Sequence, residues 1–526
     1  MSSSVVLWKP LTPKVRPAAA MSARLRISRG SGASANALFQ RAVLGVEESG
    51  GGATMGGSGL SVNDETGSAR LTGRGANFIF TTSYCKVTLN DREEKGQLAP
   101  SARRPSTETK MAFFRSCGAA LALAACTLAA SAQQQQQPPI RIAHIDTFSG
   151  PTASTGVTVS KTLLYAVNLI NERGGVLGRK LEVVAMDNAG DPAKAISMLN
   201  STVDQKISFM VQAGNSGIAG ALLGAVEKHN QRNPQSRVLY LNYGSALPEL
   251  TGEKCSFWMF RFEAHQLMKM YAIADYVKKN PQIKRIYLIN QDYAFGREVS
   301  ADAREIIGKA RPDVQFVGDD FHPFGKVKDF SPYVLKIKQS GADTVLTGNW
   351  GNDLSLLVRA SKDAGLGARY ITYYGGLFGV PTSIGAAGEN TVFQVSSWHP
   401  NVPVEDKTPA LEKYQKDFKA KFGEDLYYTS IVVQTEMLAK AIEKVGNTTD
   451  LVKIAQALEG MEYDSPFGKI QMRKDDHQAT HPLYINQLVK GVKYDAEGLG
   501  MGWKTVAKVP GAVTELPVNC KMSRPD

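Results

Sequence analysis

Two short loops combine hydroxyl and amide side chains with glycine, which are residue types that hold a carboxylate. One loop reads Gly214-Asn215-Ser216-Gly217 and the other Tyr243-Gly244-Ser245-Ala246. The first loop precedes a predicted helix, and the N-terminus of a helix presents unpaired N–H groups and partial positive charge. A third loop, Thr147–Thr152, adds hydroxyls. The sequence therefore predicts an anion-binding surface made by Ser149, Asn215, Ser216, Ser245 and Ala246.

Three further loops are rich in aromatic residues, which favour an apolar or aromatic ligand body. They cover 291–296, 348–351 and 374–376. The alternative for each residue is an ordinary turn glycine or core aromatic. We predict that these loops contribute Tyr293, Phe295, Asn349, Trp350 and Tyr374 to the same site.

The sequence lacks the usual signatures of catalysis and cofactor binding. Gly214, Gly217 and Gly220 follow a strand, but the Gly-x-Gly pair of a dinucleotide fingerprint is missing. We find neither a phosphate-binding Gly-x-x-x-x-Gly-Lys motif nor a Gly-x-Ser-x-Gly elbow. The seven histidines are scattered along the chain, and 475–477 (DDH) is expected to be a solvated turn rather than a ligand set. We predict no catalytic residue, no metal and no cofactor.

Strands and helices alternate along most of the chain, with two series that resemble each other. In the first series, strands are predicted at 141–146, 181–186, 208–212 and 238–242, with helices at 158–172, 192–203 and 218–230. In the second, strands are predicted at 285–290, 314–318, 344–347 and 370–373, with helices at 297–310, 332–339 and 353–364. This alternation predicts an α/β fold of two doubly wound parallel-sheet lobes.

The C-terminal part breaks the alternation. Helices are predicted at 409–422, 429–445 and 450–458, followed by an antiparallel strand pair at 468–472 and 483–489. We interpret this part as chain that returns to the first lobe and links the two. Because ligands of open parallel sheets bind beyond the carboxyl ends of the strands, the loops described above are expected to face one crevice.

Residues 111–132 (MAFFRSCGAALALAACTLAASA) have the features of a secretory signal. A basic start precedes an apolar run too short to span a bilayer, and Ala130-Ser131-Ala132 fits signal peptidase cleavage. The alternative is a short buried helix. A second alternative is lipid attachment at Cys126, because Leu123–Cys126 also fits a lipoprotein cleavage box. We expect cleavage after Ala132 and a periplasmic location.

Residues 1–110 are rich in Ser, Gly and Arg, and we expect them to be disordered or to be mis-assigned upstream sequence. They carry most of the formal net charge of +12. The rest of the chain is then nearly neutral, which argues against nucleic acid as a partner. Residues 133–138, with five glutamines, are predicted to be a polar tether.

Beyond the predicted signal the chain has only two cysteines, Cys255 and Cys520. In an oxidising compartment they are expected to form a disulfide that holds the C-terminal tail. The alternative is two unrelated thiols.

The ordered series of motifs from 139 to 520 resembles the type I periplasmic solute-binding proteins of ABC importers, in the leucine/isoleucine/valine-binding branch. The motifs are 140–151 with its Phe-Ser-Gly-Pro end, 171–180 (NERGGVLGRK), 244–251 (GSALPELT), 293–296 (YAFG) and 363–366 (DAGL). The resemblance implies a monomeric binder that delivers a small molecule to an inner-membrane permease. It implies two hinged lobes, the first made by 139–263 and about 398–470, the second by 264–397 and about 471–520.

The resemblance also implies roles for individual residues. Asn215, Ser216 and Ser245 match positions that hold the carboxylate of the ligand, whereas Ala246 replaces a usual small hydroxyl residue. Trp350 matches the aromatic side chain that packs on the ligand. Amino-acid binders place an acidic residue after the strand at 370–373, and this chain has Tyr-Tyr-Gly-Gly at 373–376 instead. An unpaired buried ammonium is costly, so an amine-free carboxylate or an amide is favoured.

Two other functions remain open at this stage. The same fold could serve as a ligand sensor that docks on a membrane signalling partner. A secreted α/β enzyme is the more remote alternative, because no nucleophile or acid–base pair is identified.

Overall fold

The computed structural model describes residues 60–63, 68–73, 76–81, 84–89, 137–150 and 153–525. The predicted signal at 111–132 and the cleavage sites after Cys126 and Ala132 lie outside these residues. The chain divides into two compact units, Met1–Ser116 and Cys117–Asp526.

The first unit contains a small antiparallel sheet, whereas the sequence predicts no folded element there. Its strands pair in chain order: β1 (Leu60–Asn63), β2 (Ser68–Gly73), β3 (Ala76–Thr81) and β4 (Tyr84–Leu89). Strand β3 is rich in aromatic and β-branched residues, and β4 alternates apolar with polar residues, both of which favour strands.

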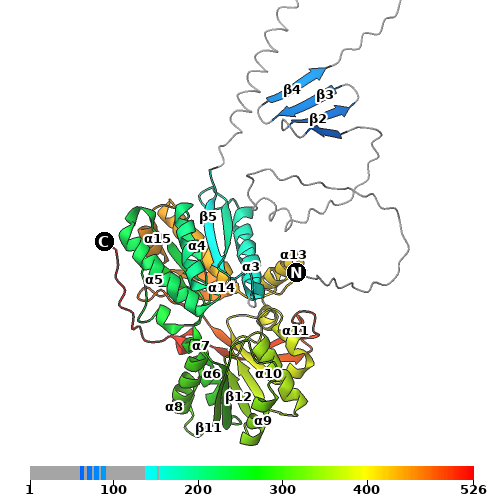
Figure 1. Cartoon of the computed structure of the whole chain (residues 1–526), viewed down its shortest axis with the longest axis vertical. Helices are drawn as coiled ribbons and strands as arrows, with labels where there is room; N and C mark the ends of the chain where they lie inside the picture. The colour runs from blue at the N-terminus through cyan, green and yellow to red at the C-terminus, as the bar shows by residue number, and fades with distance from the viewer. Residues whose placement is uncertain are drawn as a thin grey trace, which may run out of the picture. The chain divides into compact units, whose positions relative to one another are not determined.

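In the second unit, the first lobe is built on a parallel sheet with strand order β6-β5-β7-β8-β9. The strands are β5 (Ile140–Asp146), β6 (Leu181–Asp187), β7 (Phe209–Val211), β8 (Leu239–Asn242) and β9 (Met259–Arg261). The helices are α3 (Ala153–Glu172), α4 (Pro192–Asp204), α5 (Ser216–Arg232), α13 (Pro409–Phe422), α14 (Thr429–Val445) and α15 (Leu451–Leu458). Helix α4 packs against α5, and α3 packs against the returning α14 (Figure 1).

The second lobe has a seven-stranded sheet with strand order β11-β10-β12-β13-β14-β18-β19. The strands are β10 (Arg285–Gln291), β11 (Gln315–His322), β12 (Thr344–Thr347), β13 (Arg369–Thr372), β14 (Val392–Ser396), β18 (Leu483–Lys490) and β19 (Met501–Val509). The helices are α6 (Gln266–Lys279), α7 (Ala294–Asp302), α8 (Gly308–Ala310), α9 (Ser331–Ser340), α10 (Asn352–Asp363), α11 (Val380–Ile384), α12 (Val402–Glu405) and α16 (Gly511–Thr514). A π-helical segment at Ala303–Ile307 interrupts the single α-helix predicted at 297–310.

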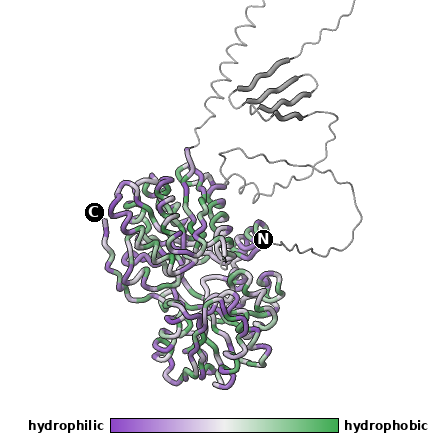
Figure 2. Tube along the Cα trace, in the orientation of Figure 1, coloured by the Kyte–Doolittle hydropathy of each residue, from purple (hydrophilic) through white to green (hydrophobic). Residues whose placement is uncertain are grey.

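The predicted fold class is confirmed. The first sheet is parallel throughout, the second is parallel from β11 to β14, and helices surround both sheets. Hydrophobic segments run through the interior of both lobes in Figure 2. In each sheet the strand order reverses once, between β5 and β7 and between β10 and β12. The loops that follow these strands therefore border the crevice where ligands of such sheets bind.

The predicted strand pair at 468–472 and 483–489 is wrong. Strand β16 (Gly468–Met472) pairs with β15 (Glu462–Ser465) and β17 (Ala479–Thr480), whereas β18 pairs with β14 and β19. Strand β18 is buried over most of its length, so it must lie inside the second lobe's sheet. Met472 and Ala479 belong to the core of the first lobe, so the final crossing between lobes follows Thr480 rather than residue 470.

The C-terminal tail is joined to the first lobe by a disulfide between Cys255 and Cys520, whose Cα atoms are 5.6 Å apart. Among the described helices, none is long and apolar enough to cross a membrane.

Candidate functional site

The start of helix α5 forms the polar wall of the crevice on the first lobe. Asn215 is its N-cap, and the Asn215 Oδ1 atom accepts hydrogen bonds from the N–H groups of Gly217 (2.9 Å) and Ile218 (3.2 Å). Two of the N–H groups expected to face the ligand are therefore already satisfied. The Ser216 hydroxyl, within 3.5 Å of the Ser245 hydroxyl, remains at the helix end together with the helix dipole.

The position of this helix start is fixed by a buried carboxylate at the end of β5. Asp146 is 1% exposed and accepts hydrogen bonds from the Tyr243 hydroxyl (2.6 Å) and the Thr147 N–H (2.8 Å). A Cβ atom on Gly214 would lie 2.3 Å from Asp146 Oδ1. Only glycine permits this approach, so β5, β7 and β8 end in one rigid arrangement.

The loop after β8 is fixed by hydrogen bonds with two buried side chains, Asn242 and Arg261. Asn242 Oδ1 accepts the N–H groups of Gly244 (3.1 Å) and Ser245 (2.8 Å). The Arg261 guanidinium donates to the carbonyl oxygens of Ser245 (3.2 Å) and Leu247. Burial lowers the pKa of Arg261 to about 9, so the side chain stays protonated at neutral pH. Its charge favours an anion in front of the loop.

Aromatic side chains from the second lobe form the opposite wall. The Trp350 Nε1–H donates to the Tyr293 hydroxyl at 3.0 Å, and the ring centroids of Trp350 and Phe324 are 5.2 Å apart. Phe295 lies between Tyr293 and Tyr374, at centroid distances of 6.0 and 5.8 Å. Burial raises the pKa of Tyr293 and of Tyr374, so both hydroxyls are neutral.

The two walls enclose a cavity of ≈ 220 Å³, hereafter the main cavity. Among the described residues, its lining contains hydroxyl, amide, aromatic and aliphatic groups and no Asp, Glu, Lys or Arg. The lining residues are Thr155, Ala213, Gly214, Asn215, Ser216, Tyr243, Gly244, Ala246, Tyr293, Phe295, Phe324, Trp350, Tyr374, Leu377 and Tyr428.

Most residues predicted from the sequence lie in this lining, and three do not. Those in the lining are Asn215, Ser216, Ala246, Tyr293, Phe295, Trp350 and Tyr374. Ser149 is exposed and donates a hydrogen bond to the Asp187 carboxylate. Burial of Asp187 raises the pKa of its carboxyl group, but the hydrogen bonds from Ser149 and from neighbouring N–H groups outweigh this and lower the pKa below its ordinary value. Ser245 is 1% exposed, behind Ser216. Asn349 is fully buried, with its N–H on the Thr347 hydroxyl.

Eight lining residues were not among the predicted site residues: Thr155, Ala213, Gly214, Tyr243, Gly244, Phe324, Leu377 and Tyr428. Phe324 was missed because β11 runs to His322, beyond the strand end predicted at 318, which hid the loop that follows. Tyr428 precedes α14, an element from the returning chain whose place at the crevice has no local signal.

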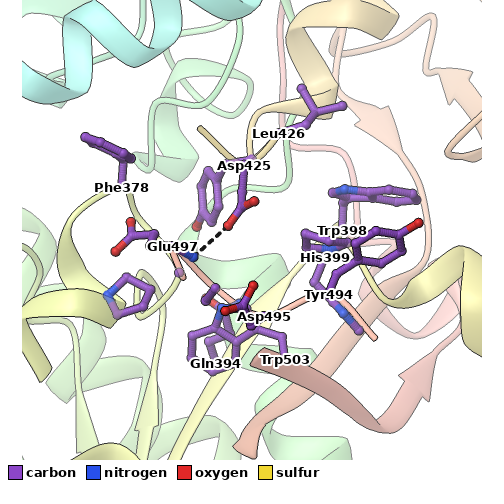
Figure 3. A pocket seen from close by; sticks show the side chains of 15 residues that line it. Phe378, Gln394, Trp398, His399, Asp425, Leu426, Tyr494, Asp495, Glu497 and Trp503 are labelled. Carbon is purple, nitrogen blue, oxygen red and sulfur yellow. Dashed lines mark hydrogen bonds between the residues drawn. The ribbon is translucent and has the colours of Figure 1, made fainter. Parts of the chain in front are cut away.

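A separate cavity of ≈ 30 Å³ contains three carboxylates, Asp425, Asp495 and Glu497 (Figure 3). Asp425 Oδ2 accepts the N–H of Glu497 at 2.9 Å, the dashed line in Figure 3. The Glu497 carboxylate accepts N–H groups from Gly379 and Thr382. This cavity is too small for an organic solute and its acids have donors of their own, so these contacts hold the turn between β18 and β19. Within the described part of the chain, no cluster of His, Cys, Asp and Glu is suited to a metal ion.

Comparison with known proteins identifies the family to which this chain belongs. Residues 139–493 match the family described as periplasmic binding protein. The chain belongs to this family. The Leu/Ile/Val-binding protein homolog 4 of Brucella abortus (strain 2308) is 35% identical over 422 residues, which cover 77% of this chain and 98% of that relative.

Solved structures share this fold. The leucine-, isoleucine-, valine-, threonine- and alanine-binding protein from Brucella ovis, in a closed conformation, has a TM-score of 0.67 and 33% identity, covering 74% of this chain and 100% of that chain. A solute-binding protein from Rhodopseudomonas palustris BisB5 in complex with 3,4-dihydroxybenzoic acid has a TM-score of 0.61 and 19% identity, covering 71% and 98%. This periplasmic binding protein is thus a substrate-binding protein of the ABC-transporter class, from a family that binds solutes and is not enzymatic.

Proposed function

We propose that this periplasmic binding protein captures a small, amine-free organic carboxylate between its lobes and delivers it to an inner-membrane permease. The observation that carries the proposal is the main cavity, with a helix N-terminus and hydroxyls on one wall and five aromatic rings on the other. Closure of the lobes excludes water, which strengthens the few polar contacts that the ligand makes.

The polar wall supports a carboxylate as the recognised group. Ser216 supplies a hydroxyl at the start of α5, and the helix dipole and the buried Arg261 add positive potential behind it. Among the described residues, no side chain that lines the wall carries a formal negative charge; the Asp146 carboxylate lies behind Gly214 and accepts hydrogen bonds from Tyr243 and Thr147.

The uncharged lining argues against an α-amino acid, although relatives of this chain are named for binding Leu, Ile and Val. An α-ammonium lies next to its carboxylate, so it would be buried in the main cavity without an acidic partner. Burial of an unpaired charge is strongly unfavourable. Aromatic or aliphatic acids and amides avoid this penalty and match the aromatic wall.

Calorimetry on a panel of aromatic acids, aliphatic acids and amino acids tests the proposal. We expect an amine-free acid to bind more tightly than leucine, and Ser216→Ala to weaken it about tenfold, the effect of losing one hydrogen bond to a charged group. Ser331→Ala, at the exposed start of α9, is the matched control and should change nothing. If no acid binds more tightly than about 1 mM, the proposal fails.

Family membership implies an extracytoplasmic location, and we propose that the signal at 111–132 directs the export. Mass spectrometry of the exported protein should give an N-terminus at Gln133. An N-terminus at an acylated Cys126 would establish lipid anchoring instead. We also propose a monomer, which light scattering during size-exclusion chromatography tests.

A further inference from the structure

A second cavity of ≈ 310 Å³ adjoins the main cavity and is more polar; we name it the annex. The two cavities share four lining residues, Thr155, Phe324, Trp350 and Leu377. Trp350 and Phe324 thus separate two compartments of one crevice. A ligand held by its carboxylate at Ser216 extends along these rings toward the annex.

The annex contains a buried carboxylate, in contrast to the main cavity. Asp353 lies in the first turn of α10 and is 2% exposed. Its Oδ2 atom accepts hydrogen bonds from Gln291 Nε2 and from the Gly325 N–H, each at 2.8 Å. Among the described residues, no group donates a hydrogen bond to its Oδ1 atom, and no Lys, Arg or His forms a salt bridge with the carboxylate. Lys328, which also lines the annex, is exposed.

Gln291 is a second buried polar residue of the annex, and one of its hydrogen-bond acceptors has no partner among the described residues. It is 1% exposed and ends β10. Its amide Nε2 donates to Asp353 and, at 3.4 Å, to the carbonyl oxygen of Trp350. Its Oε1 atom is buried and has no partner among the described residues. Two acceptors, one charged and one neutral, thus lie together at the wall of a cavity.

Buried acceptors are normally hydrogen-bonded, which Gln291 Oε1 is not among the described residues, and a buried carboxylate is normally paired with a cation. The dipole of α10 and the two N–H donors on Oδ2 stabilise Asp353 only in part. We infer that the annex binds a hydrogen-bond donor, an ammonium or a hydroxyl group, at the end of the ligand distal to its carboxylate. This inference rests on the proposed function and adds a specificity determinant, Asp353, to it.

The inference distinguishes a distal donor from an α-amino group. An α-ammonium would lie in the main cavity, whose lining has no acid, whereas a donor several bonds away reaches the compartment that contains Asp353. The two compartments therefore select bifunctional acids with well-separated ends.

Calorimetry on the full-length chain with three para-substituted benzoates tests this inference: 4-methylbenzoate, its isostere 4-hydroxybenzoate, and 4-(aminomethyl)benzoate. Hexanoate and 6-aminohexanoate form a flexible pair. We expect the donor-bearing acids to bind at least about tenfold more tightly than their donor-free partners, which is the size of one charge-assisted hydrogen bond. Asp353→Asn should reduce affinity for the amines about tenfold or more and change that for 4-methylbenzoate less than about twofold.

Asp363→Asn, which removes an exposed carboxylate from the other end of α10, is the matched control and should retain the preference. Equal affinities for all three benzoates in the unmutated protein would overturn the inference and leave the proposed function intact. A preference that survives Asp353→Asn would assign Asp353 to stabilising α10 alone and also overturn it. If no acid binds, the proposed function fails and the inference with it. The ligand series on the unmutated protein decides the matter even if the variant does not fold.

Discussion

Replacement of Trp350 by alanine measures how much of the binding energy comes from the aromatic wall. The Trp350 ring is half-buried and lines both compartments of the crevice. A ring face covers on the order of 60 Å² of ligand, and at about 25 cal/mol per Å² this contact contributes about 1.5 kcal/mol. Aromatic packing geometry adds about 1 kcal/mol. We expect Trp350→Ala to lower affinity about 30- to 100-fold.

The ligand-free protein should be much less affected. Alanine removes the hydrogen bond to the Tyr293 hydroxyl and the contact with Phe324, which together stabilise the fold by about 1 kcal/mol. The melting temperature should therefore fall by only about 1 °C, because the entropy of unfolding grows with chain length. Trp350→Phe, which keeps a ring and loses the Nε1–H donor, should retain most of the affinity.

Isothermal titration calorimetry and differential scanning calorimetry on the three proteins provide both readouts. A fall of about ten degrees in the ligand-free melting temperature of Trp350→Ala, beyond what about 1 kcal/mol produces, would show that Trp350 is a core residue. Unchanged affinity would show that the aromatic wall does not contact the ligand. Either result would refute the assignment of Trp350 to binding.

Three further predictions concern the supports of the site and the stability of the fold. Gly214→Ala should weaken both ligand binding and folding by about 1–3 kcal/mol, because the added Cβ would collide with Asp146. Gly220→Ala is the control and should not destabilise the protein, since nothing lies within 4 Å of the added Cβ. Calorimetry on both variants tests this prediction. Burial lowers the pKa of His399 to about 3, and the partly exposed Glu405, 3.8 Å away, does not offset this. Because unfolded histidine takes up a proton below about pH 6.5, stability should fall by about 2 kcal/mol at pH 5, and urea denaturation of His399→Gln should show a smaller loss. Thiol titration of the protein cleaved after Ala132 should find no free thiol, and two reactive thiols would contradict the disulfide.

Much of the fold could be predicted because its elements carry local boundary signals. Helices α13 and α14 have the predicted bounds, since each ends at a glycine with positive φ, Gly423 and Gly446. Strand β12 also has its predicted bounds, as a short apolar strand between polar turns. Strand β9 was missed because it has three residues and ends in Arg261, a residue type that is rarely buried.

The site was harder to predict than the fold, because side-chain direction depends on contacts from distant elements. Ser149 lies in a loop bonded to β6, so it turns away from the cavity. The expectation of a solvated turn at 475–477 is wrong for two of its residues, because Asp476 is 3% exposed and His477 is fully buried. His477 stacks on Phe260 with ring centroids 3.9 Å apart, a contact across more than 200 residues that has no local signature.

The way the two lobes share the C-terminal third of the chain has a consequence for assembly. The first lobe packs α3 against α14, and the second closes its sheet by pairing β14 with β18. The first lobe lacks part of its core until residues up to about Ala479 have been synthesised, and the second until β18 and β19 follow. A helix face of the first lobe and a strand edge of the second stay uncovered until then. Each lobe therefore depends on a segment that is synthesised long after its first strands, and the C-terminal third of the chain ties the folding of one lobe to that of the other.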